Sequence, residues 1–127
     1  MLGNSRFTKE HLQDLLCNAF EGGSNYWYEI ESFGYPPGVT AKSLKAEGKY
    51  PHLELPLIKG GALVIFDCED PDERWTLDRE AIKRGLVALK EKYPDRHYRD
   101  ALDPSVMDAC TGDVFLQCCL FGDVVYG

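Results

Sequence analysis

The sequence predicts an α+β domain in which a small, mostly antiparallel sheet packs against three helices, the third of them central. Three segments carry apolar residues at helical spacing behind a capping residue. Two short segments with strand-like patterns flank an acidic turn, which is typical of a hairpin. The last helical segment is apolar nearly all round, so we expect it to be buried. A chain of 127 residues with 44% hydrophobic residues can bury about two-thirds of its surface. We therefore expect one domain over residues 1–127.

The first helix is expected to begin after Thr8 and to end at the glycine pair 22–23. Thr8 is a preferred N-cap residue, and Phe7 before it can staple onto Leu12. The two glycines supply the left-handed stop. One face of this helix holds the apolar residues Leu12, Leu15, Leu16, Ala19 and Phe20.

The second and third helices are expected to begin at Asp78 and Thr111. Pro94 ends the second, because a proline disfavours helical backbone in the residue before it. Gly122 stops the third. The second helix presents the apolar stripe Ile82, Leu86, Leu89 and Tyr93. The residues of the third helix expected to be least exposed are Phe115, Leu116, Cys119 and Leu120.

Residues 62–66 and 74–77 are expected to pair as an antiparallel hairpin around the acidic loop 67–73. A third strand is predicted over residues 26–31 and a short last strand over residues 124–126.

Residues 33–59 contain four prolines, at positions 36, 37, 51 and 56. We expect an irregular, Pro-rich excursion here rather than a regular element. Long loops of this kind in small domains are often functional.

The charge balance disfavours two classes of partner. Fourteen Lys and Arg residues against twenty-one Asp and Glu residues give a net charge of −7. Direct general binding of nucleic acid needs a basic face, and an anionic membrane surface also attracts basic proteins. The longest apolar runs are far shorter than the roughly 20 residues of a membrane span. An acidic surface can instead block a basic site on another protein, although a charge of this size also simply keeps a small protein soluble.

The cysteines predict neither a disulfide framework nor a zinc site. Their number is odd, at five, and no Cys-x-x-Cys pair occurs. Residues 1–6 lack the apolar segment of a secretory signal, so we expect a cytoplasmic protein with reduced thiols. The acidic loop does not have the spacing of a calcium-binding loop, and the three histidines lack ligand spacing. We therefore expect no metal and no cofactor.

Catalytic signatures are also absent from the sequence, so no catalytic residue is assigned and a non-enzymatic protein is expected. The densest group of aromatic residues follows the glycine pair, over residues 24–28. It predicts either a stacking surface for a nucleotide-like ligand or a part of the core.

On the pocket interpretation, an alternating strand buries Trp27 and exposes Tyr28. The candidate ligand-binding residues are then Tyr28 and Tyr35, with Lys59 and Arg99 as counter-charges for an anion. A basic segment on and after the second helix provides further positive charge, or a solvated face. Its members are Lys83, Arg84, Lys90, Lys92, Arg96 and Arg99.

Three sequence blocks together resemble a widespread family of small proteins encoded by tailed bacteriophages and prophages. The blocks are Gly22–Trp27, the hairpin Leu63–Leu77, and Asp108–Gln117 followed by Leu120–Gly127. The resemblance covers most of the chain outside residues 33–59, where this sequence is longer and richer in proline. The paired Cys118 and Cys119 are a second departure. The family brings no catalytic residues with it.

The resemblance implies a phage accessory protein that acts in the cytoplasm of the bacterial host by binding. One expected role is counter-defence, by sequestering a small nucleotide-like signal. The alternative is an acidic inhibitor that caps a host defence protein such as a CRISPR effector. A third hypothesis is a small enzyme of unknown reaction. The expected partner is accordingly a small ligand or a host protein, and a homo-oligomer stays open.

Overall fold

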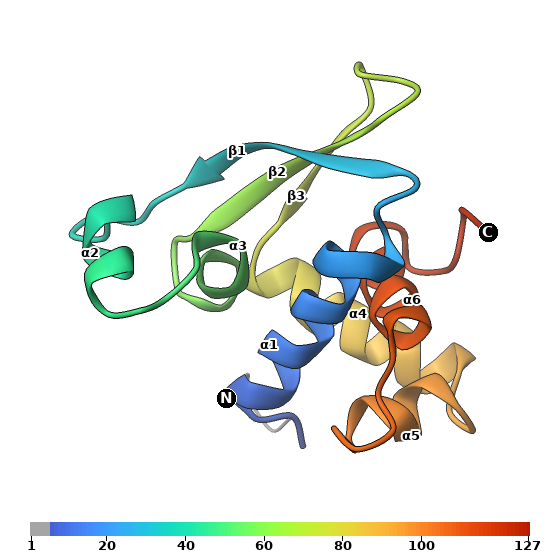
Figure 1. The fold of residues 1–127 in the computed structure, drawn as a ribbon. Helices are drawn as coiled ribbons and strands as arrows, with labels where there is room; N and C mark the ends of the chain where they lie inside the picture. The colour runs from blue at the N-terminus through green and yellow to red at the C-terminus, as the bar shows by residue number, and fades with distance from the viewer. Residues whose placement is uncertain (1–5) are drawn as a thin grey trace.

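Helices cover one face of a three-stranded sheet in the computed structural model, which describes residues 6–127 (Figure 1). This arrangement confirms the predicted α+β class. The α-helices are α1 (Lys9–Asn18), α2 (Ala41–Ala46), α3 (Pro51–Glu54), α4 (Arg79–Lys92), α5 (His97–Ala101) and α6 (Ala109–Phe121). The strands are β1 (Tyr28–Gly34), β2 (Ala62–Asp67) and β3 (Arg74–Leu77). Two further helical turns are η1 (Ala19–Gly23), a π-turn, and η2 (Leu55–Leu57), a 3₁₀ turn.

The sheet has the order β1-β2-β3, and both pairings are antiparallel. The predicted hairpin is therefore confirmed, with Leu63 opposite Leu77 and Phe66 opposite Arg74. Side chains alternate along β2, so that Leu63 and Ile65 are fully buried against the helices. The β2–β3 loop extends beyond the body of the molecule (Figure 1).

The helix α6 lies between α1 and α4, and its burial confirms that the third predicted helix is central. Two glycines allow this close packing. A Cβ on Gly85 of α4 would lie 2.3 Å from Cys119 Sγ, and one on Gly112 of α6 would lie 2.6 Å from the backbone nitrogen of Ala19. Phe115 and its neighbours are fully buried, but Leu120 is half-buried because it lies in the last turn of α6.

Local capping chemistry sets the starts of the long helices. Thr8 caps α1 in a reciprocal pair of 3.1 Å hydrogen bonds with His11, and Asp78 caps α4. The third helix begins earlier than predicted, because Asp108 accepts a 2.8 Å hydrogen bond from the Thr111 N–H. Thr111 is therefore a first-turn residue of α6 and not its cap.

The segment 33–59 is not the irregular excursion that its prolines predicted. It holds the end of β1, the helices α2 and α3, and the turn η2. Thr40 and Ser43 cap α2 reciprocally, and Pro51 occupies the first turn of α3, where its missing N–H costs nothing. The apolar anchors of the segment are Leu44 and Leu55, which are buried.

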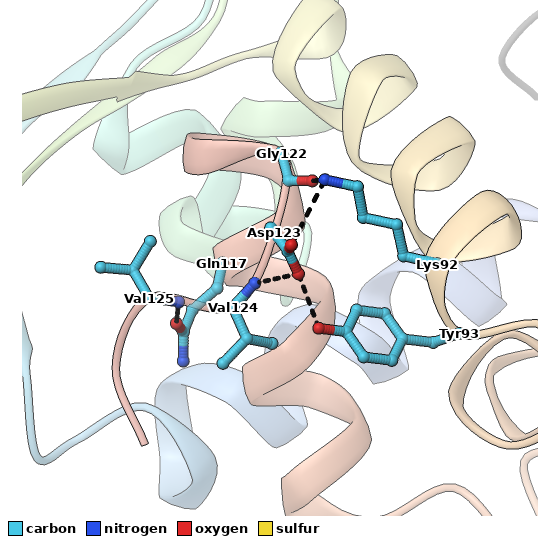
Figure 2. A network of polar contacts seen from close by, with 7 residues as sticks. All are labelled: Lys92, Tyr93, Gln117, Gly122, Asp123, Val124 and Val125. Atoms are coloured by element: carbon cyan, nitrogen blue, oxygen red, sulfur yellow. Dashed lines mark hydrogen bonds and ion pairs between the residues drawn. The ribbon is translucent and has the colours of Figure 1, made fainter.

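The predicted last strand is also absent among the described residues. Residues 124–127 run as an extended strap across the end of α6 without strand pairing. Figure 2 shows how the strap begins: Asp123 accepts hydrogen bonds from Tyr93 Oη at 2.6 Å and from the Val124 N–H at 2.8 Å. Lys92 Nζ donates to the Gly122 carbonyl at 2.8 Å, which ties the strap to the end of α4.

Candidate functional site

Trp27 and Tyr28 of the aromatic segment after the glycine pair lie in the core, whereas Tyr26 is exposed, and one carboxylate organises the segment. Asp113 Oδ1 accepts hydrogen bonds from Ser24 Oγ at 2.7 Å and from the indole nitrogen of Trp27 at 2.9 Å. Its Oδ2 accepts from Tyr26 Oη at 2.6 Å. Gln117 Nε2 adds a fourth donor, 3.1 Å from Oδ1. With four donors already bound to its carboxylate, Asp113 acts as a structural group that joins residues 24–27 to α6.

Gln117 extends this network to the strap. Its Oε1 accepts hydrogen bonds from the backbone N–H groups of Val125 and Tyr126, at 2.7 and 2.8 Å. Its Nε2 donates to the Tyr126 carbonyl at 3.1 Å, and Tyr126 Oη donates to Asp67. The side chain of Gln117 is fully buried and replaces the strand partner that residues 124–126 lack. The first and last sequence blocks of the family resemblance thus meet in one polar network.

Tyr28 is buried, so the prediction that it forms an exposed contact is wrong. Trp27 is buried as predicted, with 2% of its surface exposed, but Tyr28 is only 9% exposed. Residues 24–27 form a turn and β1 begins at Tyr28, so strand alternation does not separate the two rings. Tyr28 Oη donates to the Phe20 carbonyl at 3.0 Å, and burial raises the pKa of this phenol.

The other three predicted ligand-binding residues do not line one common depression. Tyr35 is half-buried and packs against the core. Lys59 and Arg99 are exposed, but they line different depressions, of about 530 and 620 Å³. Tyr28 and Tyr35 line neither of them. The four residues therefore do not form the single aromatic and basic pocket that the sequence predicted.

The depression around Lys59 lies where the loop before β2 meets the start of α4, and we call it the α4 pocket. Gly60 has a φ of +83°, which favours glycine, and it turns the chain at the rim. Gly61 lies so close to η2 that a Cβ there would be 2.4 Å from the Leu55 carbonyl oxygen. The lining residues of the α4 pocket are Lys59, Gly60, Gly61, Ala62, Asp78, Arg79, Glu80 and Lys83.

Both carboxylates of the α4 pocket already have partners. Asp78 accepts a 2.9 Å hydrogen bond from the Ala81 N–H as the cap of α4. Glu80 Oε1 lies 3.3 Å from Lys83 Nζ, an exposed pair one turn apart. Asp78 therefore serves as a helix cap, and Glu80 pairs with a lysine of the same helix.

Two of its cations have no polar partner among the described residues. The Nε atom of Arg79 is buried, and in residues 6–127 it is the one buried side-chain nitrogen or oxygen without a hydrogen-bond partner. Lys59 Nζ takes part in no ion pair or hydrogen bond within the same range. Because buried polar groups nearly always have a partner, the orphaned Nε of Arg79 needs an explanation. Sequence patterns did not single out Arg79, since the burial of its Nε arises only in the folded chain.

Two of the cysteines and one histidine are held in their neutral forms. Burial raises the pKa of the Cys118 thiol to about 11, and a hydrogen bond to Glu21 raises that of Cys17 to about 11. Burial lowers the pKa of His97, whose Nδ1 lies 3.0 Å from Thr111 Oγ1. Within the described residues, no three His, Cys, Asp or Glu side chains gather as metal ligands.

No protein-family model, no curated protein and no solved structure matches this chain. The resemblance to phage-encoded proteins therefore stays a prediction from the sequence. Over residues 6–127, every helix is too short or too polar to cross a membrane.

Proposed function

We propose that the protein is a phage-encoded accessory protein that acts in the host cytoplasm by binding and sequestering a small, phosphate-bearing, nucleotide-like ligand. The observation that supports this function is the buried, unpartnered Nε of Arg79 in a pocket shared with Lys59 and Lys83. The ligand supplies the missing acceptor.

A phosphate group fits this site chemically. The guanidinium of an arginine presents its N–H groups in a planar fork that matches phosphate oxygens, whereas a lysine acts as a point charge. Satisfying a buried donor also recovers a desolvation cost of about 1–3 kcal/mol. Arg79 therefore provides the directional contact, and Lys59 adds charge from the facing loop.

The α4 pocket is locally positive on an acidic protein. The chain as a whole has a net charge of −7, but the pocket has three cations, Lys59, Arg79 and Lys83, against two carboxylates. It also lies at the N-terminus of α4, a helix of 14 residues. The dipole of such a helix favours an anion at this end. The charge of this pocket and its place at the N-terminus of α4 thus both favour a bound anion.

Sequestration means that the ligand is held and not converted. The protonated thiols of Cys17 and Cys118 are poor nucleophiles, and both lie outside the α4 pocket. We therefore expect a bound phosphate compound to be recovered chemically unchanged.

The test is isothermal titration calorimetry with inorganic pyrophosphate at low ionic strength. Binding is expected for the unchanged chain and is expected to weaken at least tenfold in Arg79→Gln and several-fold in Lys59→Gln, since each loses a charge-assisted contact. Arg99→Gln, which removes one charge from the other depression, is the matched control and should bind normally. Absence of pyrophosphate binding, or a loss in Arg99→Gln alone, contradicts the proposal. Phosphorus NMR after overnight incubation should show intact pyrophosphate, and hydrolysis would favour an enzyme.

The acidic β2–β3 loop favours the second candidate function, an inhibitor that caps a basic surface of a host defence protein. The loop projects from the body (Figure 1), and its exposed carboxylates are Glu69, Asp70, Asp72 and Glu73. Capture from host lysate would be compared between the unchanged chain and the double variant Asp72→Asn, Glu73→Gln. A host protein retained only by the unchanged chain supports capping, and equal retention contradicts it.

A further inference from the structure

A second depression continues the α4 pocket along the same helix. It has a volume of about 420 Å³, and Lys83 is a lining residue of both depressions. We call this second depression the Val87 surface. Its lining residues are Lys83, Arg84, Val87, Ala88, Glu91, Lys92 and Gly122.

Three of these residues follow one another along a single ridge of α4. Lys83, Val87 and Glu91 are spaced four residues apart, so their side chains project from successive turns on one side of the helix. Eight residues at a rise of 1.5 Å separate the first from the last by about 12 Å. A ligand with its phosphate at Lys83 would therefore lay its other end over Val87 toward Glu91, a span suited to an extended nucleotide.

The middle of the ridge suits a flat ring. Val87 is apolar and 57% exposed, although it lies within a long helix whose other apolar residues face the core. Beside it, the exposed guanidinium of Arg84 forms no ion pair within residues 6–127. A planar guanidinium stacks on aromatic faces, and an apolar side chain contacts the opposite face or edge. A nucleobase bound here would cover the Val87 side chain and stack on the Arg84 guanidinium.

The far end of the ridge is a hydrogen-bond acceptor. Glu91 is exposed, and it has no ion-pair partner among the described residues, whereas Lys92 beside it is bound to Gly122 and Asp123. An ionised carboxylate only accepts, and its two oxygens suit two adjacent donors. Guanine presents a ring N–H next to an amino group, whereas adenine presents a donor beside an acceptor.

We infer that the Val87 surface is the base subsite of the proposed ligand and that the ligand is a guanine nucleotide. Its phosphates lie in the α4 pocket at Arg79 and Lys83, its base lies over Val87, and Glu91 accepts from the base. This inference rests on the proposed function, because it extends the same site from the phosphate to the base.

The test compares GDP, ADP and inorganic pyrophosphate by calorimetry on the full chain. GDP is expected to bind at least tenfold more tightly than ADP, and more tightly than pyrophosphate. In Glu91→Gln the preference for GDP over ADP is expected to fall about tenfold, because one charge-assisted hydrogen bond is lost. In Val87→Ser both nucleotides should weaken while pyrophosphate binding is unchanged.

Glu10→Gln is the matched control, since it removes one exposed carboxylate from α1, outside both depressions. It should keep the GDP preference. Equal binding of GDP and ADP, or a preference for GDP that survives Glu91→Gln, overturns the base subsite. The proposed function is still supported in that case if pyrophosphate binds and its binding depends on Arg79. Failure of all three probes to bind overturns the proposed function itself. Circular dichroism of each variant confirms that a loss of binding is not a loss of folding.

Discussion

The indole ring of Trp27 and the phenol ring of Tyr126 stack face to face, with their centroids 4.9 Å apart and their planes 4° apart. The contact joins the turn before β1 to the strap that follows α6. Phe121 packs against both rings, at centroid distances of 5.6 and 5.8 Å. The strap is thus held by ring packing as well as by the buried amide of Gln117.

Removing the Tyr126 ring should loosen the strap without unfolding the domain. Tyr126→Ala is expected to lower the free energy of unfolding by about 1 kcal/mol or more, since one stacked aromatic pair contributes roughly that amount. Tyr126→Phe keeps the stack and loses only the hydroxyl hydrogen bond to Asp67. Its free energy of unfolding should therefore lie between those of Tyr126→Ala and the unchanged chain. Urea unfolding measures all three chains. Equal stability of Tyr126→Ala and the unchanged protein would show that the stack does not stabilise the fold.

Tyr28 should behave as a core residue. Tyr28→Ala removes a ring packed 5.3 Å from Phe20 and 5.6 Å from Trp27, so we expect a loss of about 3 kcal/mol in the free energy of unfolding. Tyr28→Phe loses only the hydrogen bond to the Phe20 carbonyl and should cost about 1 kcal/mol. Thermal melting measures both variants. A melting temperature unchanged in Tyr28→Ala would restore the expectation of an exposed contact.

The packing of α4 on α6 should not tolerate a methyl group at Gly85. Alanine is the better helix former by about 1 kcal/mol, so helix propensity alone predicts that Gly85→Ala stabilises α4. The added Cβ would however lie 2.8 Å from the Cα and 2.9 Å from the backbone nitrogen of Cys119, atoms that can move only if the helices separate. We expect a net loss of about 2 kcal/mol, typical of overpacking.

The control for this change is Val87→Ala, a truncation on the exposed side of the same helix. It should leave the free energy of unfolding within about 0.5 kcal/mol of the unchanged chain. Chemical unfolding of both variants shows whether close packing or helix propensity determines the effect of Gly85→Ala on stability. A more stable Gly85→Ala chain would mean that α4 and α6 lie further apart than the structure places them.

Local signals predicted the parts of the fold that depend on local chemistry. Capping residues located the starts of α1 and α4, apolar spacing located α6, and the turn residues located the hairpin. The helices in 33–59 were missed because prolines were treated as breakers, although Pro51 lies in a first turn, where proline is tolerated.

The features missed at the site depend on residues far apart in the chain. Gln117 binds the strap with its side-chain amide, and no pattern in residues 124–126 distinguishes such a strap from a strand. Lys59 was predicted from its charge, but its neighbours Arg79 and Lys83 come from a different element. The spacing of Lys83, Val87 and Glu91 is visible in the sequence. It points to a binding surface only once the structure places these residues next to the α4 pocket.

The five cysteines are predicted to be free thiols of unequal reactivity. Cys68 and Cys110 are exposed, Cys17 is partly buried, and Cys118 and Cys119 are buried. A thiol-specific chromogenic reagent at pH 8 should therefore modify two thiols readily in the native protein and all five after unfolding without reductant. Three thiols after unfolding would indicate a disulfide, and rapid native modification of all five would contradict the burial of Cys118 and Cys119.

The buried imidazole of His97 should make the fold less stable as the pH falls from 7.5 to 5.5. Burial, and then the neighbouring Arg96, lower the pKa of His97, while Asp100 and Asp108 oppose them more weakly. The unfolded chain takes up a proton near the ordinary pKa of about 6.5, whereas the folded chain resists protonation to a lower pH. The unfolded state then binds more protons in this range, so the free energy of unfolding decreases with decreasing pH.

Replacing His97 tests how much this residue contributes to the change of the free energy of unfolding with pH. His97→Asn keeps a polar atom near Thr111 and cannot titrate, so its free energy of unfolding should vary less between pH 7.5 and 5.5 than that of the unchanged chain. The slope should shrink rather than vanish, because burial also lowers the pKa of His52 with the same sign. Urea unfolding at several pH values measures the slope directly. An identical slope in both chains would mean that His97 titrates alike in the folded and unfolded states, against its burial beside Thr111.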